Sequence, residues 1–368
     1  MVYRVLGLMS GSSLDGLDIA FVEFQVTPGK WVYEIKSSAC FPYSNEWIEK
    51  LSSATTLNAL EYQLLHTAYG KYIGEQVNKF IQEKGIQYQV QLIASHGHTT
   101  FHVPAQKMTA QLGDGAAIAA ATGINVVSDL RSIDIALSGQ GAPIVPIGEK
   151  LLWPEYEWLL NIGGIANLSF KNAENPIAFD VCPANRVLNL LANEAGKSYD
   201  ENGAMAASGK IHVDLLHKLN ALDYYKQDYP KSLANDFGTQ VVYKLIHDAG
   251  YFSNDALCTY VEHIVFQLTV AFEKIMSKSS RLPASNSRLL ITGGGAHNIF
   301  LIKRLTEAIK QLTIEVTVPE KEVIDNKEAI VMALIGVLRW REENNVLASV
   351  TGASRNSIGG AVWIGQEA

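Results

Sequence analysis

The hydrophobic and polar positions at the start of the chain predict two strands joined by a small, polar turn. Apolar residues are dense from Val5 to Leu8 and again from Ile19 to Val22. Between these runs, residues 10–18 are rich in glycine, serine and aspartate. Two apolar runs around a turn of this composition are typical of a β-hairpin. A third strand is expected at 31–40.

Further along the chain the apolar period changes and predicts helices as well as strands. Apolar residues recur at helical spacing from 57 to 80, and Gly85 is expected to end this long amphipathic helix. The segment before residue 150 also predicts strands at 90–95 and 125–127 and a small-residue helix at 116–122. The second half is mostly helical, with expected helices at 213–222, 234–249, 256–278, 298–310 and 326–341, a strand at 288–292 and a short apolar stretch at 361–364.

The opening pattern returns near the middle of the chain. An apolar run at 158–162 precedes Gly163 and Gly164, and a second run follows at 165–170. A repeated unit of strand, glycine turn and strand indicates two similar domains of the α/β class. We expect an N-terminal domain over 1–150 and a C-terminal domain over 151–349. The C-terminal segment 350–366 could pack back onto the N-terminal domain.

Composition and charge exclude several classes of protein. With 368 residues, of which 48% are hydrophobic and 18% charged, the chain is expected to fold into two globular domains. A net charge of −7 argues against a nucleic-acid partner. The three cysteines, Cys40, Cys182 and Cys258, show no zinc-site spacing and no disulfide framework. No signal peptide or membrane-spanning run is recognised, so no membrane partner and a cytoplasmic location are expected.

The first turn combines groups that suit the phosphates of a nucleotide. Gly11 and Gly16 allow backbone N–H groups to come close to a ligand, and the serines at 12 and 13 add hydroxyl donors. Asp15 and Asp18 add carboxylates that could hold Mg²⁺ or its waters. The alternative is an ordinary hairpin loop, because short glycine-rich loops are common.

Two more glycine turns follow apolar strands. Gly163 and Gly164 form the middle turn, and three glycines at 293–295 lie between a buried strand and a helix that begins near Asn298. A glycine turn in that position lets a flat or phosphorylated ligand lie against the backbone and the helix N-terminus.

Polar residues at other strand ends are candidates for substrate binding. His96, His98 and His102 lie close together, but a glycine separates them and no acidic partner follows, so a polar-substrate loop is favoured over a metal site. An ordinary structural loop is the alternative. Asp129, Arg131 and Asp134 stand among small and apolar neighbours and indicate either an internal salt-bridge network or a sugar-binding loop.

Asp180 directly follows the apolar residues 177–179. A carboxylate at the end of a strand lies at an edge where catalytic groups are commonly placed. The alternative is that it caps the following helix, which Pro183 could open.

Three glycine turns, each after a strand, resemble the actin/hexokinase/Hsp70 superfamily. There, two related, ribonuclease H-like domains flank a nucleotide cleft, one hairpin from each holds phosphates, and a third turn holds the adenosine. Over essentially the whole chain, the motifs also resemble those of the anhydro-N-acetylmuramic acid kinase family. They are 10–18 (SGSSLDGLD), 95–97 (SHG), 113–114 (GD), 139–143 (GQGAP), 161–167 (NIGGIAN), 292–298 (TGGGAHN) and 350–353 (VTGA).

The resemblance implies ATP-dependent phosphorylation of 1,6-anhydro-N-acetylmuramic acid with hydrolytic opening of the anhydro bridge. The product would be N-acetylmuramic acid 6-phosphate, in peptidoglycan recycling. It also implies that Asp180 is the base that activates water, that His96, Arg131 and Glu328 bind the sugar, and that ATP and Mg²⁺ are the cofactors, with Asp15 near the metal. The implied ATP-binding residues are Gly11, Ser12, Ser13, Asp15, Gly16, Asp18, Gly163, Gly164, Gly293, Gly294, Gly295 and Asn298.

The chain departs from the family pattern at several positions. The usual Asp-Thr-Gly-Pro-Gly-Asn is here residues 180–185 (DVCPAN), and His98 and Gly115 replace a glutamine and a proline. A threonine-rich helix start is reduced to residues 257–260 (LCTY). Two alternatives are therefore kept: a kinase of the same fold for a different anhydro or amino sugar, and a non-catalytic nucleotide-binding protein. A homodimer is left open.

Overall fold

The chain forms two compact units. One comprises Met1–Pro154 with Asn326–Ala368, and the other comprises Glu155–Asp325. The computed structural model describes residues 1–11, 14–171, 177–229, 231–233, 236–251, 253–278 and 287–365. Ser12 and Ser13, two of the expected ATP-binding residues, lie outside the described residues.

The first unit is built on a seven-stranded mixed sheet. β1, β2 and β3 form an antiparallel meander, β4 and β6 continue the sheet in parallel with β1, and β12 closes it antiparallel to β6. β5 pairs with the outer part of β4. The strands are β1 (Val2–Ser10), β2 (Gly16–Thr27), β3 (Lys30–Pro42), β4 (Leu92–Val103), β5 (Met108–Leu112), β6 (Val126–Ser128) and β12 (Ala361–Trp363).

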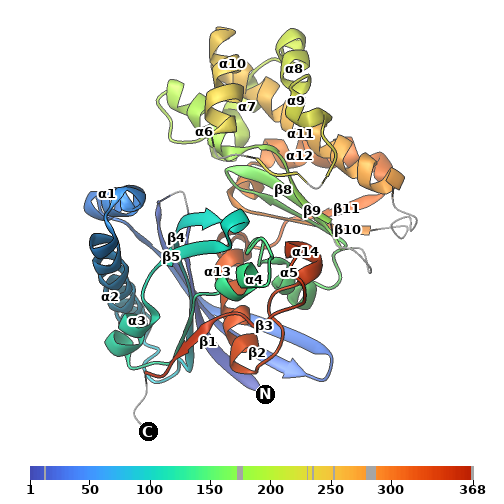
Figure 1. Ribbon diagram of the computed structural model, residues 1–368. Helices are drawn as coiled ribbons and strands as arrows, with labels where there is room; N and C mark the ends of the chain where they lie inside the picture. The colour runs from blue at the N-terminus through green and yellow to red at the C-terminus, as the bar shows by residue number, and fades with distance from the viewer. Residues whose placement is uncertain are drawn as a thin grey trace. The chain divides into compact units, whose positions relative to one another are not determined.

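Helices cover both faces of this first sheet (Figure 1). α2 begins with a capping box between Asn58 and Glu61 and ends at Gly85, which has a φ of 64°, so the predicted helix end is confirmed. The helices of this unit are α1 (Asn45–Ser52), α2 (Ala59–Lys84), α3 (Gly115–Thr122), α4 (Ser132–Ala136), α5 (Pro146–Leu152), α13 (Lys321–Trp340) and α14 (Ala348–Thr351), with short 3₁₀ turns at Ala54–Thr56 and Pro104–Gln106.

From Asn326 onward, α13 belongs to the first unit, although the sequence placed this helix in the second domain. Its backbone packs directly on the first sheet. A Cβ at Gly7 would lie 1.9 Å from the carbonyl oxygen of Ala329, and one at Gly336 would lie 2.5 Å from the Cβ of Ala94. Such a close approach requires glycine and cannot be read from hydrophobic periodicity.

The second unit repeats the strand order of the first. β7, β8 and β9 form an antiparallel meander, and β10 and β11 continue in parallel with β7, as β4 and β6 do with β1. The strands are β7 (Trp158–Ile162), β8 (Ile165–Phe170), β9 (Ile177–Pro183), β10 (Ser287–Thr292) and β11 (Ile314–Thr317). The α/β class and the expected relationship between two halves are confirmed by this repeat.

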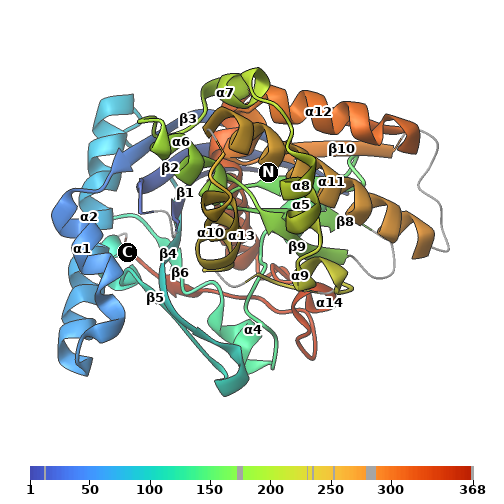
Figure 2. The same ribbon diagram turned by 90° about the horizontal axis from the view of Figure 1, so that it is seen from above.

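Most helices of the second unit stack over one face of its sheet (Figures 1 and 2). The long α11 is the centre of this layer, and Phe272 on it packs edge-on against Trp158 with ring centres 5.0 Å apart. The helices are α6 (Asn185–Glu194), α7 (Ala204–Ser208), α8 (Val213–Asn220), α9 (Asp223–Lys226), α10 (Lys244–Asp248), α11 (Ser253–Lys278) and α12 (Ile299–Ile309), with a π-helical turn at Phe237–Tyr243 and 3₁₀ turns at Glu201–Gly203, Gly294–His297 and Lys310–Leu312.

One local expectation is wrong. The histidine-rich stretch is a strand and not a loop, because β5 supplies hydrogen-bond partners that extend β4 to Val103. In the described part of the chain, no helix has the length and apolar character needed to cross a membrane.

Candidate functional site

The first hairpin turn lies between the end of β1 at Ser10 and the start of β2 at Gly16. Packing explains the second of its glycines, since a Cβ at Gly16 would lie 2.6 Å from Cys40 Sγ. Asp15 is exposed and Asp18 half-buried. Burial raises the pKa of the Cys40 thiol to about 12, and the neighbouring Asp18 acts in the same direction. The turn therefore presents carboxylates, while Gly16 is required by the fold itself.

A buried chain of hydrogen bonds holds Ser10, the residue at the end of β1 where this turn begins. The Tyr43 hydroxyl donates to Ser10 Oγ over 2.8 Å, and Ser10 Oγ lies 3.1 Å from His98 Nδ1. Tyr69 completes the chain through a 2.5 Å contact with the Tyr43 hydroxyl. Because Tyr43 donates to Ser10, the Ser10 proton is directed at His98 Nδ1, and His98 then carries its proton on Nε2. Sequence reasoning missed this network, because its members come from β1, β4, α2 and the segment between β3 and α1.

His96 and Arg131, two of the predicted sugar-binding residues, are in direct contact. Arg131 Nε donates to His96 Nε2 over 2.9 Å, and His96 Nδ1 lies 2.8 Å from the carbonyl oxygen of Gly97. Burial lowers the pKa of His96 to about 3, and the Arg131 charge adds to that effect. His96 is therefore neutral at physiological pH, with Nε2 as acceptor and Nδ1 as donor, and it fixes the orientation of the guanidinium.

Glu328, the third predicted sugar-binding residue, belongs to the same unit. Its side chain reaches solvent, yet the protein atoms around it raise the pKa of its carboxyl, while Lys327 and Arg131 act in the opposite direction. The adjacent Lys327 is committed to a buried ion pair with Glu149, with 2.6 Å between Nζ and Oε1. Arg131 and Glu328 thus influence each other electrostatically, whereas Lys327 has a structural partner.

The charges near Arg131 divide into separate roles and do not form one network. Asp134 is fully buried and accepts hydrogen bonds from the Gly141 amide at 2.8 Å and the Thr351 hydroxyl at 2.7 Å. Arg131 Nη1 donates to the carbonyl oxygen of Gly141 over 2.9 Å. Asp134 therefore holds the turn at Gly141, and this turn fixes the position of Arg131. The role of Asp134 is structural.

The second hairpin turn has glycines that the fold does not require. The nearest atoms to a Cβ at Gly163 would be 3.6 Å away, and those at Gly164 would be 3.7 Å away. Neither has a positive φ. Their carbonyl oxygens accept from the first amides of α6, at 3.0 Å from Asn185 N and 2.8 Å from Ala184 N. A Cβ at either glycine would make only ordinary contacts, and the absence of a side chain is what close approach of a ligand to the backbone needs.

Asp180 lies within β9 and not at its end, because β9 continues to Pro183. Asn167 on β8 pairs with Asp180, whereas the preceding Ala166 pairs with Cys182, so the strand bulges at Val181. Bulges of this kind are enriched next to active sites, where they change the direction of a side chain. The sequence pattern placed Asp180 correctly after an apolar run but gave no sign of the bulge.

Both oxygens of the Asp180 carboxylate accept hydrogen bonds inside the second unit. Asn167 Nδ2 donates to Oδ1 over 3.0 Å, and the Leu233 amide donates to Oδ2 over 2.9 Å. The Asp180 carbonyl oxygen accepts from the Tyr224 hydroxyl over 2.5 Å. The helix-cap alternative is wrong, because the N-cap residue of α6 is Ala184 and no side chain caps this helix. Asp180 is instead a carboxylate held in one orientation.

The family departures beside Asp180 lie in the core. Val181, Cys182 and Ala184 are at most 2% exposed. Cys182 is fully buried, which raises the pKa of its thiol. These three substitutions consequently change packing behind the carboxylate and leave its hydrogen bonds to Asn167 and Leu233 in place.

The third glycine turn is shaped by close packing at two positions and is less crowded at the third. A Cβ at Gly293 would lie 2.7 Å from the Ile162 carbonyl oxygen, and one at Gly295 would lie 2.2 Å from Ile162 Cγ2. At Gly294, the nearest atom would be Asn185 Nδ2 at 3.3 Å. Of the three predicted ATP-binding glycines, Gly294 therefore has the most room around it.

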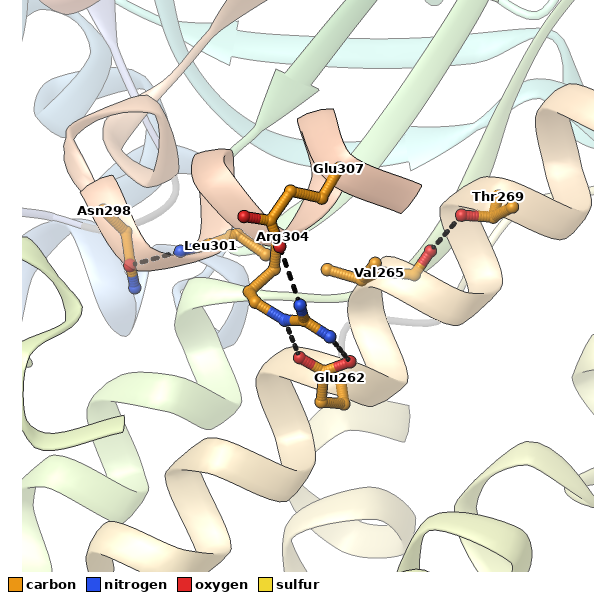
Figure 3. Close-up of polar contacts among 7 residues, drawn as sticks. All are labelled: Glu262, Val265, Thr269, Asn298, Leu301, Arg304 and Glu307. Carbon is orange, nitrogen blue, oxygen red and sulfur yellow. Dashed lines mark hydrogen bonds and ion pairs between the residues drawn. The ribbon is translucent and has the colours of Figure 1, made fainter. Parts of the chain in front are cut away.

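Asn298 caps α12 and so has a structural role in addition to any ligand contact. Its Oδ1 accepts from the Leu301 amide over 3.0 Å (Figure 3). Arg304, further along α12, grips Glu262 on α11 with both Nε and Nη2, at 2.5 and 3.0 Å. Figure 3 shows this fork between the two helices. The pair raises the pKa of Arg304 and ties the helix behind the glycine turn to α11.

No preformed metal cage is present in the described part of the chain, where no three His, Cys, Asp or Glu side chains group closely enough to hold an ion. Such a cage is not expected for Mg²⁺, which is commonly bound by one or two carboxylates together with substrate phosphates. Asp15 and Asp18 supply carboxylates of that kind.

Comparison with known proteins identifies the family of the chain. The family model for anhydro-N-acetylmuramic acid kinase matches residues 3–365. The anhydro-N-acetylmuramic acid kinase of Aliivibrio fischeri is 33% identical over 373 residues, covering 98% of this chain and 99% of that protein. The Synechococcus elongatus protein of the same name is 33% identical over 387 residues, with the same coverage of 98% and 99%.

Among solved structures, the activator of the 2-hydroxyisocaproyl-CoA dehydratase from Clostridium difficile with bound ADPNP is similar at a TM-score of 0.47. It shares 12% identity and covers 92% of this chain and 96% of its own. That likeness is too distant to carry a functional argument. The family match and the identity to curated relatives extend over almost the whole length, and the chain belongs to the anhydro-N-acetylmuramic acid kinase family.

Proposed function

We propose that this sugar kinase phosphorylates 1,6-anhydro-N-acetylmuramic acid with ATP and opens the anhydro bridge with water, giving N-acetylmuramic acid 6-phosphate. The observation that carries the proposal is Asp180, an oriented carboxylate at a strand bulge in a chain that matches the family over residues 3–365.

The reaction needs one base and one phosphoryl transfer. Water forms a bond to the anomeric carbon, the bond from that carbon to the 6-oxygen breaks, and the water proton passes to the Asp180 carboxylate. The released 6-oxygen then forms a bond to the γ-phosphorus, and ADP leaves. A positioned base of this kind typically contributes about 10²–10⁴-fold to a rate.

The contacts of Asp180 suit the role of the base. An ionised carboxylate offers about four lone-pair positions, and Asn167 and Leu233 occupy one on each oxygen. The remaining positions can accept a hydrogen bond from water. Because both donors come from the backbone or from a neighbouring strand of the same unit, the carboxylate is oriented before substrate binds.

The phosphates are assigned to the glycine turns. A Cβ at Gly163 or Gly164 would make only ordinary contacts, and Gly294 is the least crowded glycine of the third turn. The first turn offers Gly11 with Asp15 and Asp18. We place Mg²⁺ at Asp15, where it would neutralise charge on the transferring phosphoryl group. Gly16, Gly293, Gly295 and Asn298 support the turns through packing or capping as well.

The sugar is assigned to His96, Arg131 and Glu328. The contacts of Arg131 with His96 and Gly141 use two of its five N–H donors. The others can serve the oxygens of a sugar. Glu328 accepts from hydroxyl groups when ionised. Burial raises the pKa of its carboxyl, and the Arg131 charge acts in the opposite direction.

The direct test is a coupled assay of ADP release with and without 1,6-anhydro-N-acetylmuramic acid, followed by mass analysis of the product. We expect ADP release that depends on this sugar. Sugar-dependent release only with another anhydro or amino sugar would support the same-fold alternative. ATP binding without turnover on any of these sugars would support the non-catalytic alternative.

The proposal places the reaction in peptidoglycan recycling and in the cytoplasm, where ATP is available. Fractionation of cells that produce the protein tests the location. The mass of the protein in solution, measured by light scattering, tests whether it forms a homodimer.

A further inference from the structure

The first unit contains a pocket of about 300 Å³ that has His96 among its lining residues. All of its lining residues belong to the first unit. They come from the start of α2, from β4 and β5, from the turns before α3 and after β6, and from β12. Its volume is at the lower end of the range typical of small-molecule sites.

Two buried polar atoms in the pocket wall lack a hydrogen-bond partner within the described residues. They are Ser95 Oγ and Gln111 Oε1. Ser95 is only 1% exposed. The side-chain amide nitrogen of Gln111 donates to the Thr109 hydroxyl over 2.8 Å, which fixes the orientation of the side chain. The amide oxygen is therefore the atom that lacks a partner. A buried polar atom without a partner costs free energy, and a ligand in the pocket would supply the partner.

The pocket wall is acidic. Asp114 and Asp129 both line it, together with His66, and its described lining residues include no lysine or arginine. Burial lowers the pKa of His66, while the two aspartates act in the opposite direction, so both carboxylates are close enough to affect this ring. His66 Nδ1 accepts from the Gly113 amide at 3.2 Å, which leaves its Nε2 to carry a proton.

The two aspartates make hydrogen bonds within the protein, and their carboxylates can still accept further hydrogen bonds. Asp114 Oδ1 accepts from the Ala116 amide over 2.9 Å and caps α3. Asp129 accepts from the Ser132 hydroxyl through Oδ1. Each carboxylate has further lone pairs, so the pocket holds a surplus of acceptors, two negative charges, and a few donors such as the Ser95 hydroxyl.

We propose that this pocket binds a small hydroxylated amine, such as a sugar with a free amino group, whose ammonium lies between Asp114 and Asp129. The ammonium supplies three donors and the positive charge that the wall lacks. The hydroxyl groups of the ligand form hydrogen bonds with Ser95 Oγ and Gln111 Oε1. The described residues form no three-ligand metal group, so the occupant is an organic cation and not a metal ion.

The proposal depends on the positive charge of the ligand, and two ligands that differ only in the amino group test the effect of that charge. D-glucosamine and N-acetyl-D-glucosamine share the ring and hydroxyl groups, but only the first carries an ammonium at pH 6.5. Binding is measured by calorimetric titration of the whole protein without ATP. We expect D-glucosamine to bind at least about tenfold more tightly than its acetylated partner, and higher salt to weaken it.

The chain offers charge-removing variants that keep the local structure. Asp114→Asn retains a good helix cap, and Asp129→Asn retains a residue that tolerates the φ of 55° found there. Each should weaken D-glucosamine binding by about tenfold, and Ser95→Ala by a few-fold. Asp248→Asn, an exposed site on α10 in the other unit, removes the same charge and should change nothing.

Three results would overturn the proposal: no detectable binding of D-glucosamine, equal binding of the acetylated partner, or unchanged binding in both aspartate variants. Melting temperatures of the variants show whether they are folded. Because the titration requires neither ATP nor turnover, it stands or falls separately from the proposed kinase reaction, which the ADP-release assay tests.

Discussion

The β1–β2 turn and the β7–β8 turn occupy the same place in the repeated strand order, yet they carry different groups. The first presents Asp15 and Asp18, and a buried chain from Tyr69 to His98 supports it. The second has no side chains at Gly163 and Gly164, where a Cβ would make only ordinary contacts. The comparison shows that the repeated fold supplies a position, while the residues in the turn decide what is bound there.

The difference continues beyond the turns. In the first unit the polar groups are His96 within β4 and Arg131 after β6, which suit a sugar. In the second unit the meander instead bears Asp180, held at a bulge by Asn167 and Leu233. We infer that the first unit contributes substrate binding and the second the catalytic base.

The largest expected effect comes from removing that base. Asp180→Asn keeps the shape of the side chain but cannot accept a proton, so turnover should fall by about 10²–10⁴-fold. The melting temperature should stay nearly unchanged, since α6 is capped by the carbonyl oxygens of Gly163 and Gly164 and not by Asp180.

An Asp180→Asn protein with near-normal turnover would contradict the base assignment. Asp200→Asn is the control for a structural aspartate of the same unit. Asp200 accepts from the amides of Met205 and Ala206. That variant should alter stability more than turnover.

A pair of glycine variants separates ligand space from packing. Gly164→Val adds a side chain whose Cβ would make only ordinary contacts with Arg186, so the fold should survive while ATP binding weakens by at least about tenfold. Gly295→Val would force atoms into Ile162 and should destabilise the protein by about 1–3 kcal/mol. Nucleotide titration and thermal melting measure the two effects. Unaltered ATP affinity in a folded Gly164→Val protein would contradict the phosphate assignment.

Acid should destabilise both units through one buried histidine each. The pKa values of His96 and His263 are both lowered to about 3 by burial, below the ordinary value of 6.5. The unfolded chain therefore takes up protons that the folded chain does not as the pH falls below 6.5 towards 3. The stability contribution is complete above pH 6.5, and about 2 kcal/mol per histidine should be lost by pH 5.

Chemical denaturation at pH 7 and pH 5 measures this loss. His263→Gln cannot titrate but keeps the ability to bond to Asn220 and Tyr225, which both lie within 3 Å of the ring nitrogens. It should reduce the difference between the two pH values. An unchanged difference would mean that His263 is not the source.

The smallest expected effect concerns the support of the third glycine turn. Arg304→Met removes the fork to Glu262 but keeps much of the apolar side chain. Since Arg304 is about one-third exposed, the loss of stability should be about 1 kcal/mol or less. Thermal melting measures it, with Lys303→Met on the same helix as the control. A loss of several kcal/mol would show that this pair matters more than its exposure suggests.

Local patterns predicted the elements that local forces decide. The two hairpins follow from alternating apolar runs around small residues, and the end of α2 follows from Gly85. The family motifs also led to His96, Arg131 and Asp180. The structure then brings His96 and Arg131 into contact and orients Asp180 through Asn167.

Long-range contacts could not be predicted in the same way. The assignment of α13 to the first unit depends on close backbone packing at Gly7 and Gly336, which has no periodic signal. The stretch expected to be a histidine loop is a strand because it pairs with β5. The bulge at Val181 and the Ser10–His98 contact likewise arise from residues that are brought together only by the fold.

The most direct test of the proposed reaction is to follow the solvent oxygen. The protein is incubated with ATP, Mg²⁺ and 1,6-anhydro-N-acetylmuramic acid in ¹⁸O-labelled water, and the product is analysed by mass spectrometry at early times, with correction for exchange at the free anomeric centre. If Asp180 activates water, each turnover places one ¹⁸O at the anomeric carbon and a phosphate on the 6-oxygen. A phosphorylated product that retains the anhydro bridge, or that gains no label beyond exchange, would contradict the proposed reaction.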